Sequence, residues 1–132
     1  MSDARAVGWL LGNDDRERLM GLIAPTWPDI VAHHVTLKFG DPAAALPRET
    51  VGEIVGEADD GAGVQALVVS IGGTTDRPDG GTYHVTWSLA DGREARESNA
   101  VIAERGWAAL PAPATLRLHP QGFERTGSSS AS

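Results

Sequence analysis

Short stretches in which apolar and polar residues alternate, separated by turn residues, restrict most strongly how this chain can fold. A period of two places the apolar side chains on one face of a strand. Gly, Pro and Asp between the stretches are typical of turns. We therefore expect more strands than helices. The expected strands span residues 5–11, 30–39, 50–57, 64–71, 82–89 and 116–119.

Two short helices are expected between these strands. Asp14 followed by Glu17 has the spacing of a capping box, and an apolar stripe with helical spacing runs on from there until Pro25 forbids continuation. Ser98 can cap a second helix, which Gly106 would end. The whole pattern predicts an α+β fold with mainly antiparallel sheet and two short helices.

Length and composition indicate one small domain. The chain has 132 residues, and we expect residues 1–125 to form a single domain, followed by a polar tail over 126–132. The absence of cysteine excludes disulfides, zinc–thiolate sites and a thiol nucleophile. No apolar run approaches the ~20 residues of a membrane-spanning helix. We expect a cytoplasmic monomer that does not bind a membrane.

The charge limits the class of partner. The formal net charge is −7, and Lys38 is the only lysine of the sequence. A protein that binds duplex DNA needs many cations to neutralise phosphates, so the charge argues against that function. A small pocket that holds one phosphate remains compatible with it.

One motif stands above the general pattern. A His-Val-Thr segment followed by an apolar residue occurs twice, at residues 34–37 and 84–87, and both copies lie in expected strands. Strict alternation would place the histidine and the threonine of each copy on one face, with the valine in the core. The predicted polar side chains are His34, Thr36 and Lys38 in the first copy and His84, Thr86 and Ser88 in the second.

With these two motifs the chain resembles the 2H phosphoesterase family, whose members carry His-apolar-Ser/Thr-apolar once in each half of a pseudo-symmetric α+β domain. The first copy is similar to the family's first motif in detail, including the trailing Phe39-Gly40. The resemblance implies a phosphodiesterase that opens 2′,3′-cyclic phosphates, or cleaves 2′–5′ linkages, on nucleotides or RNA ends, without metal or cofactor. The lack of an expected helix between residues 50 and 83 indicates a reduced second half.

The residue types suit this chemistry. Ring opening needs a base to activate water and an acid to protonate the departing ribose oxygen, and two imidazoles can divide these roles near neutral pH. We therefore expect His34 and His84 to be the acid–base pair, in an order that the sequence leaves open. Thr36 and Thr86 would hold the non-bridging phosphate oxygens. The expected substrate-binding residues are Lys38 and Ser88.

Three other interpretations remain open. His33 or His119 could complete a histidine metal site, although His33 is expected to face away from His34 and to be structural. The chain could be a non-catalytic module that binds a nucleotide or a protein on a 2H-like scaffold. It could also be a small antiparallel interaction domain without a ligand.

Overall fold

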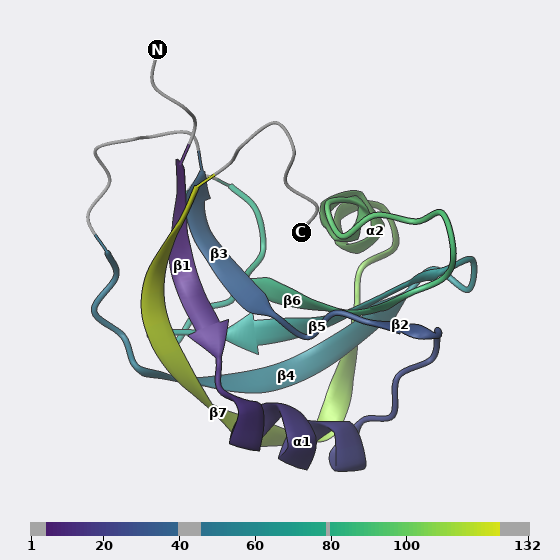
Figure 1. Ribbon diagram of the computed structural model, residues 1–132, viewed down its shortest axis with the longest axis horizontal. Helices are drawn as coiled ribbons and strands as arrows, with labels where there is room; N and C mark the ends of the chain where they lie inside the picture. Colours follow the sequence, from purple (N-terminus) through teal and green to yellow (C-terminus); the bar gives the residue numbers. More distant parts are fainter. Residues whose placement is uncertain (1–4, 40–45, 79, 125–132) are drawn as a thin grey trace.

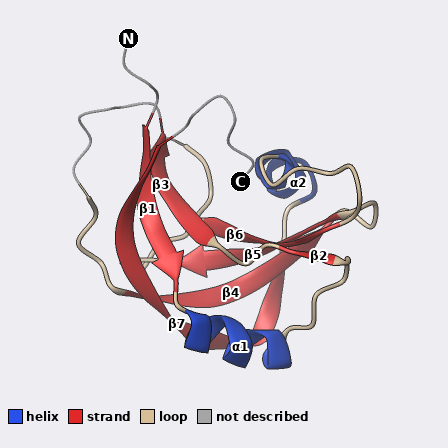
Figure 2. Ribbon diagram, in the orientation of Figure 1, coloured by secondary structure: helices blue, strands red, loops and turns tan. Residues whose placement is uncertain are grey.

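The computed structural model describes residues 5–39, 46–78 and 80–124 (Figures 1 and 2). The expected tail over 126–132 lies outside these residues. The elements are β1 (Arg5–Leu11), α1 (Asn13–Leu22), β2 (Asp29–Ile30), β3 (His34–Phe39), β4 (Val51–Asp59), β5 (Val64–Ser70), β6 (His84–Leu89), α2 (Glu97–Arg105) and β7 (Ala108–Glu124). The prediction of a small α+β domain with mainly antiparallel strands is confirmed.

Six of the strands in the described part of the chain close into an antiparallel barrel. Neighbouring strands follow the order β6-β3-β1-β7-β4-β5, and β5 pairs back with β6. The short β2 lies beside β6 next to the barrel, and both helices lie outside it (Figure 2). Closure removes the exposed edges of the sheet. It also makes β3 and β6, the two strands that carry the repeated motif, direct neighbours.

Side chains fill the barrel, and α2 covers part of its outer wall. Trp9, Trp87 and Leu67 lie fully buried in the interior cluster. On the outer side, Ala66 and Val68 of β5 belong to a second apolar cluster with Val101 and Ile102 of α2. Both faces of β5 are therefore covered, which explains why its sequence is a near-continuous apolar run rather than an alternating one.

The last strand is much longer than expected. Residues 116–119 were predicted, whereas β7 spans Ala108–Glu124 and pairs with β4 along its first part and with β1 along its second. Proline cannot donate to a strand ladder and is therefore confined to edges and bulges. The structure accommodates Pro111 and Pro113 because the register with β4 jumps from Ala109 to Ala114, so both prolines lie in a bulge.

The expected strand over 30–39 is interrupted, which corrects the prediction. Ile30 pairs with Ser88 and Val35 with Val85, so this segment advances five residues while β6 advances three. The two extra residues lie at 31–33, where Ala32 has a φ of 42°. A positive φ is unusual for alanine and breaks the extended backbone.

Neither helix is capped as predicted. Gly12, which has no side chain to offer, occupies the N-cap position of α1, and the buried Asp15 instead accepts the backbone N–H of Arg117 at 2.6 Å. Arg96 occupies the N-cap position of α2, and Ser98 is buried within the helix. The predicted end of α2 at Gly106 is confirmed by a φ of 73° there.

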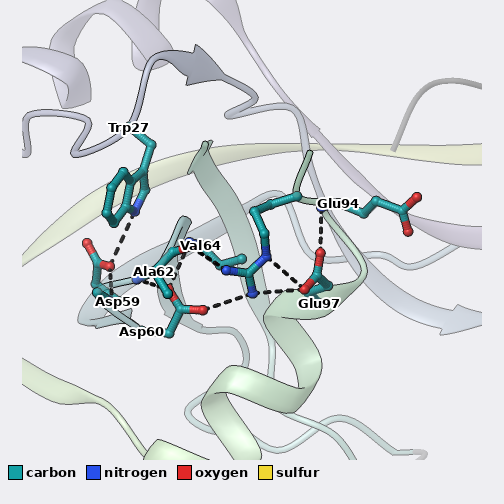
Figure 3. A network of polar contacts seen from close by, with 9 residues as sticks. Trp27, Asp59, Asp60, Ala62, Val64, Glu94 and Glu97 are labelled. Atoms are coloured by element: carbon teal, nitrogen blue, oxygen red, sulfur yellow. Dashed lines mark hydrogen bonds and ion pairs between the residues drawn. The ribbon is translucent and has the colours of Figure 1, made fainter. Parts of the chain in front are cut away.

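A polar network fixes the start of α2 to the β4–β5 hairpin (Figure 3). Arg93 pairs with Asp60 at 2.9 Å and with Glu97 at 2.8 Å. Desolvation raises the pKa of Asp60, but the N–H groups of Ala62 and Val64 together with Arg93 outweigh it and lower the pKa. The network therefore holds α2 against the barrel wall beside β6. In the described residues, no helix is long and apolar enough to cross a membrane.

Candidate functional site

The two His-Val-Thr segments lie side by side on the barrel wall. Val35 of β3 pairs antiparallel with Val85 of β6, and both valines are fully buried. This register places His34 beside Thr86 and Thr36 beside His84, with all four side chains directed away from the valine face. Residues directly opposite each other, such as His34 and Thr86, have Cβ atoms about 5 Å apart. Residues on the diagonal, such as His34 and His84, have Cβ atoms about 7–8 Å apart. The structure therefore brings together the four residues that were predicted to be catalytic.

His84 is held in one orientation. Its Nδ1 lies 2.8 Å from the backbone carbonyl oxygen of Thr82, so this nitrogen carries the proton and donates it. In the neutral ring Nε2 is then a bare acceptor. Burial lowers the pKa of His84, the bond to Thr82 opposes that shift, and the charge of Arg77 adds to it.

His34 is half-buried and is also neutral at pH 7. Burial, together with the charges of His33 and His84, lowers its pKa to about 4. His33, which was expected to face away from His34, lies against it: the two Nδ1 atoms are 2.9 Å apart and the rings cross at 85°. That expectation was wrong because the break at residues 31–33 interrupts the alternation.

The two threonines differ. Thr36 is half-buried, whereas Thr86 lies under α2 with 7% of its surface exposed. The Thr86 hydroxyl is 2.8 Å from the hydroxyl of Ser98 and 3.1 Å from the carbonyl oxygen of Ala95. Thr86 therefore ties β6 to the start of α2 in this structure.

Ser88 does not share the face of Thr86, so its predicted position was wrong. The β5–β6 register pairs Gln65 with Ser88 but Ala66 with Thr86, and the extra residue on β6 reverses the alternation. Ser88 is fully buried, its hydroxyl lies 2.5 Å from Oε1 of Gln65, and it accepts the backbone N–H of Trp27.

The side chain of Lys38 lies outside the described residues. Its backbone is described, and a bulge between β1 and β3 pairs Lys38 with Val7 while Thr36 pairs with Gly8. The role expected for Lys38 therefore stays a prediction.

A pocket of about 380 Å³ opens beside His84. Its walls come from β6, from α2 and from residues 77 and 80–82, which precede β6. The lining residues are Arg77, Gly80, Gly81, Thr82, His84, Asn99, Ile102 and Ala103. This volume is within the ~300–1,000 Å³ of typical small-molecule sites.

The sequence reasoning missed Arg77 and Asn99. Arg77 lies over Gly81, where an added Cβ would come within 3.0 Å of Cζ, Nε and Nη2 of the guanidinium group. Glycine at 81 therefore lets the arginine lie flat beside the pocket. The sequence held part of the signal for Arg77, because this arginine comes shortly before two consecutive glycines, Gly80 and Gly81, that precede the second motif. The contribution of Asn99 requires α2 to be placed over β6, which the local pattern does not encode.

Among the described side chains, no group of three or more His, Asp or Glu residues is arranged to hold a metal ion. Comparison of the chain with protein families, with curated proteins and with solved structures finds no match.

Proposed function

We propose that this chain is a metal-independent phosphodiesterase that opens 2′,3′-cyclic phosphates of nucleotides or RNA ends, in the manner of the 2H phosphoesterases that its two motifs resemble. The observation that carries the proposal is the pairing of Val35 with Val85. It aligns two imidazoles and two hydroxyls on one side of adjacent strands, on a rigid barrel wall. Such a constellation suits acid–base catalysis at a single phosphorus atom.

The hydrogen bonds support a division of roles. Because Nδ1 of His84 donates to Thr82, its Nε2 can accept the proton of an attacking water. The water oxygen then bonds to phosphorus while the bond from phosphorus to one ribose oxygen breaks. His34 supplies the proton that this leaving oxygen takes up. A bound phosphate anion next to His34 would raise the pKa of that residue and so favour its protonated form.

Arg77 takes the place that was first given to Lys38 as the phosphate-binding cation. The charge of Arg77 affects His84, and both residues line the same pocket. A guanidinium group can bind two phosphate oxygens at once, which a lysine ammonium cannot do with fixed geometry. In this proposal Thr36 also binds the phosphate. The pocket next to His84 would hold the rest of a terminal nucleotide, which fits a small ligand better than long RNA.

One observation favours a second candidate, a non-catalytic nucleotide-binding module. The hydroxyl of Thr86 is engaged with Ser98 and Ala95, so one member of the motif serves the fold. In that case the pocket would bind a nucleotide without turnover.

A turnover assay separates the two candidates. The pure protein would be incubated with a panel of 2′,3′-cyclic nucleotides and with a short RNA that ends in a cyclic phosphate, and ring opening would be followed by ³¹P NMR. We expect ring opening that EDTA does not change and that His84→Asn abolishes, while His119→Gln is the matched control on the exposed part of β7. Binding without ring opening for every substrate would favour the non-catalytic module. Loss of activity in EDTA would contradict the metal-independent mechanism.

A further inference from the structure

The hydroxyl of Thr86 has no proton left for a ligand. A threonine hydroxyl has a single proton to donate. The carbonyl oxygen of Ala95, 3.1 Å away, can only accept, so it takes that proton, and the hydroxyl of Ser98 donates to Thr86 at 2.8 Å. The residue is also 7% exposed. In the proposed function, a phosphate beside His84 would therefore need another uncharged donor.

Asn99 follows directly after the residue that fixes the start of α2 against β6, which is Ser98. Three residues of the helix have the spacing i, i+3 and i+4, which places them on one helix face. They are Asn99, Ile102 and Ala103, and all three line the pocket that His84 also lines. The helix therefore presents one polar side chain to this pocket, the carboxamide of Asn99.

The amide nitrogen of Asn99 can donate one more hydrogen bond than the structure uses. Nδ2 donates to the carbonyl oxygen of Arg96 at 3.3 Å, within the same helix. A carboxamide nitrogen carries two N–H groups. In the described part of the chain Nδ2 makes no second hydrogen bond, and the residue is exposed. The pocket wall thus contains a donor that a ligand oxygen can reach.

The two asparagines of the sequence line two different hollows, and the charges of these hollows differ. A hollow of about 210 Å³ beside α1 is lined by an arginine together with Asn13 and Glu17. The pocket beside His84 also has an arginine, Arg77, but none of its described lining residues is acidic, in a chain with 18 acidic and 11 basic residues. A carboxylate repels an anion, so the pocket that contains Asn99 is the better site for a phosphate.

We propose that Asn99 is a ligand-binding residue that donates its Nδ2–H to a phosphate oxygen, and so fills the role that the repeated motif gives to Thr86. The charge of Arg77 would act on the same phosphate from the opposite chain segment of the pocket wall. The engaged hydroxyl of Thr86 would then be compatible with ring opening. That the ligand is a phosphate ester rests on the proposed function, whereas the contribution of Asn99 to anion binding is measurable without it.

The first test reads the side chain of Asn99 without turnover. The sequence has two asparagines, so ¹H–¹⁵N spectra should show two side-chain NH₂ groups of this type, which the variants below assign. Titration with inorganic phosphate and with each common ribonucleoside 3′-monophosphate should move the signals of Asn99 and leave those of Asn13 in place. Unmoved Asn99 signals with every one of these probes would overturn the proposal.

The second test measures the contribution of the contact to affinity. Asn99→Leu keeps the approximate size of the side chain and removes both N–H groups. It should weaken binding of the tightest 3′-nucleotide about tenfold, as expected for a hydrogen bond to a charged group. Asn13→Leu is the matched control and should bind as the wild type does. Calorimetric titration would give the affinities, urea unfolding would verify that both variants fold, and an unchanged affinity in Asn99→Leu would overturn the assignment.

Turnover separates this inference from the proposed function. Binding that depends on Asn99 but comes without ring opening would uphold the phosphate contact and overturn the proposed catalysis. Ring opening by Asn99→Leu with the wild-type kcat/KM would uphold catalysis and overturn the role of Asn99.

Discussion

The two His-Val-Thr segments have the same sequence but different surroundings. The copy on β3 lies next to a broken strand, with Thr36 half-buried and His34 against a second histidine. The copy on β6 lies partly under α2, so that Thr86 bonds to Ser98 and His84 lines a pocket. Identical local sequence therefore lies in two environments, one without a covering helix contact at its threonine and one whose threonine also fixes the fold.

The largest expected effect tests whether both copies take part in catalysis. His84→Asn keeps a side-chain N–H near the carbonyl of Thr82 but removes Nε2, and His34→Gln removes an imidazole that carries a proton. Each should lower kcat/KM by about 10²–10⁴-fold, because general acid–base groups contribute factors of this size. Steady-state ring-opening rates would measure the loss. A variant that retains the wild-type rate would remove that copy from the mechanism.

The next effect concerns stability against pH. Because the pKa of folded His34 is about 4 and that of an unfolded histidine is about 6.5, the unfolded state binds the proton more tightly. The free energy of unfolding should therefore fall as the pH drops from about 6.5 to about 4, by about 2–3 kcal/mol from this residue. Urea unfolding at several pH values would measure the slope. His34→Gln should flatten it, and an equal slope in that variant would place the titration elsewhere.

A pair of threonine variants sharpens the comparison. Thr86→Ala removes the buried hydroxyl that bonds to the Ser98 hydroxyl and to the Ala95 carbonyl oxygen. This variant should lower the free energy of unfolding by about 1–3 kcal/mol. Thr36→Ala should change stability little and should instead reduce ring opening. Denaturant unfolding of both variants would measure the difference. Equal stability of the two variants would show that the two threonine hydroxyls contribute equally to the stability of the fold.

The smallest expected effect tests whether Arg77 or Lys38 is the cation that binds the phosphate. Arg77→Gln should raise KM about tenfold, which corresponds to the loss of about 1.4 kcal/mol, the low end for a charge-assisted hydrogen bond. Gly81→Ala should act in the same direction, because the new methyl group would meet the guanidinium group at 3.0 Å. Lys38→Gln is the matched control. A larger increase in KM for Lys38→Gln than for Arg77→Gln would return the phosphate-binding role to the lysine.

Much of the strand content followed from local pattern. The strand over residues 5–11 was predicted at its observed bounds, and the strands predicted over 50–57 and 64–71 match β4 and β5 to within two residues at each end. The placement of both motifs on strands was likewise correct. The cap predicted at Asp14 was wrong because α1 begins one residue earlier, at Asn13, with Gly12 at the N-cap position.

The sequence by itself determined that this chain forms strands and that each motif pairs an imidazole with a hydroxyl on one face, because alternation depends on neighbouring residues alone. The tertiary structure decided the register of Val35 with Val85, the bulge that buries Ser88, and the position of Arg77 beside His84. These features depend on closure of the barrel and on the docking of α2. A shift of one residue in pairing reverses every side chain, so only the closed set of partners could select the arrangement.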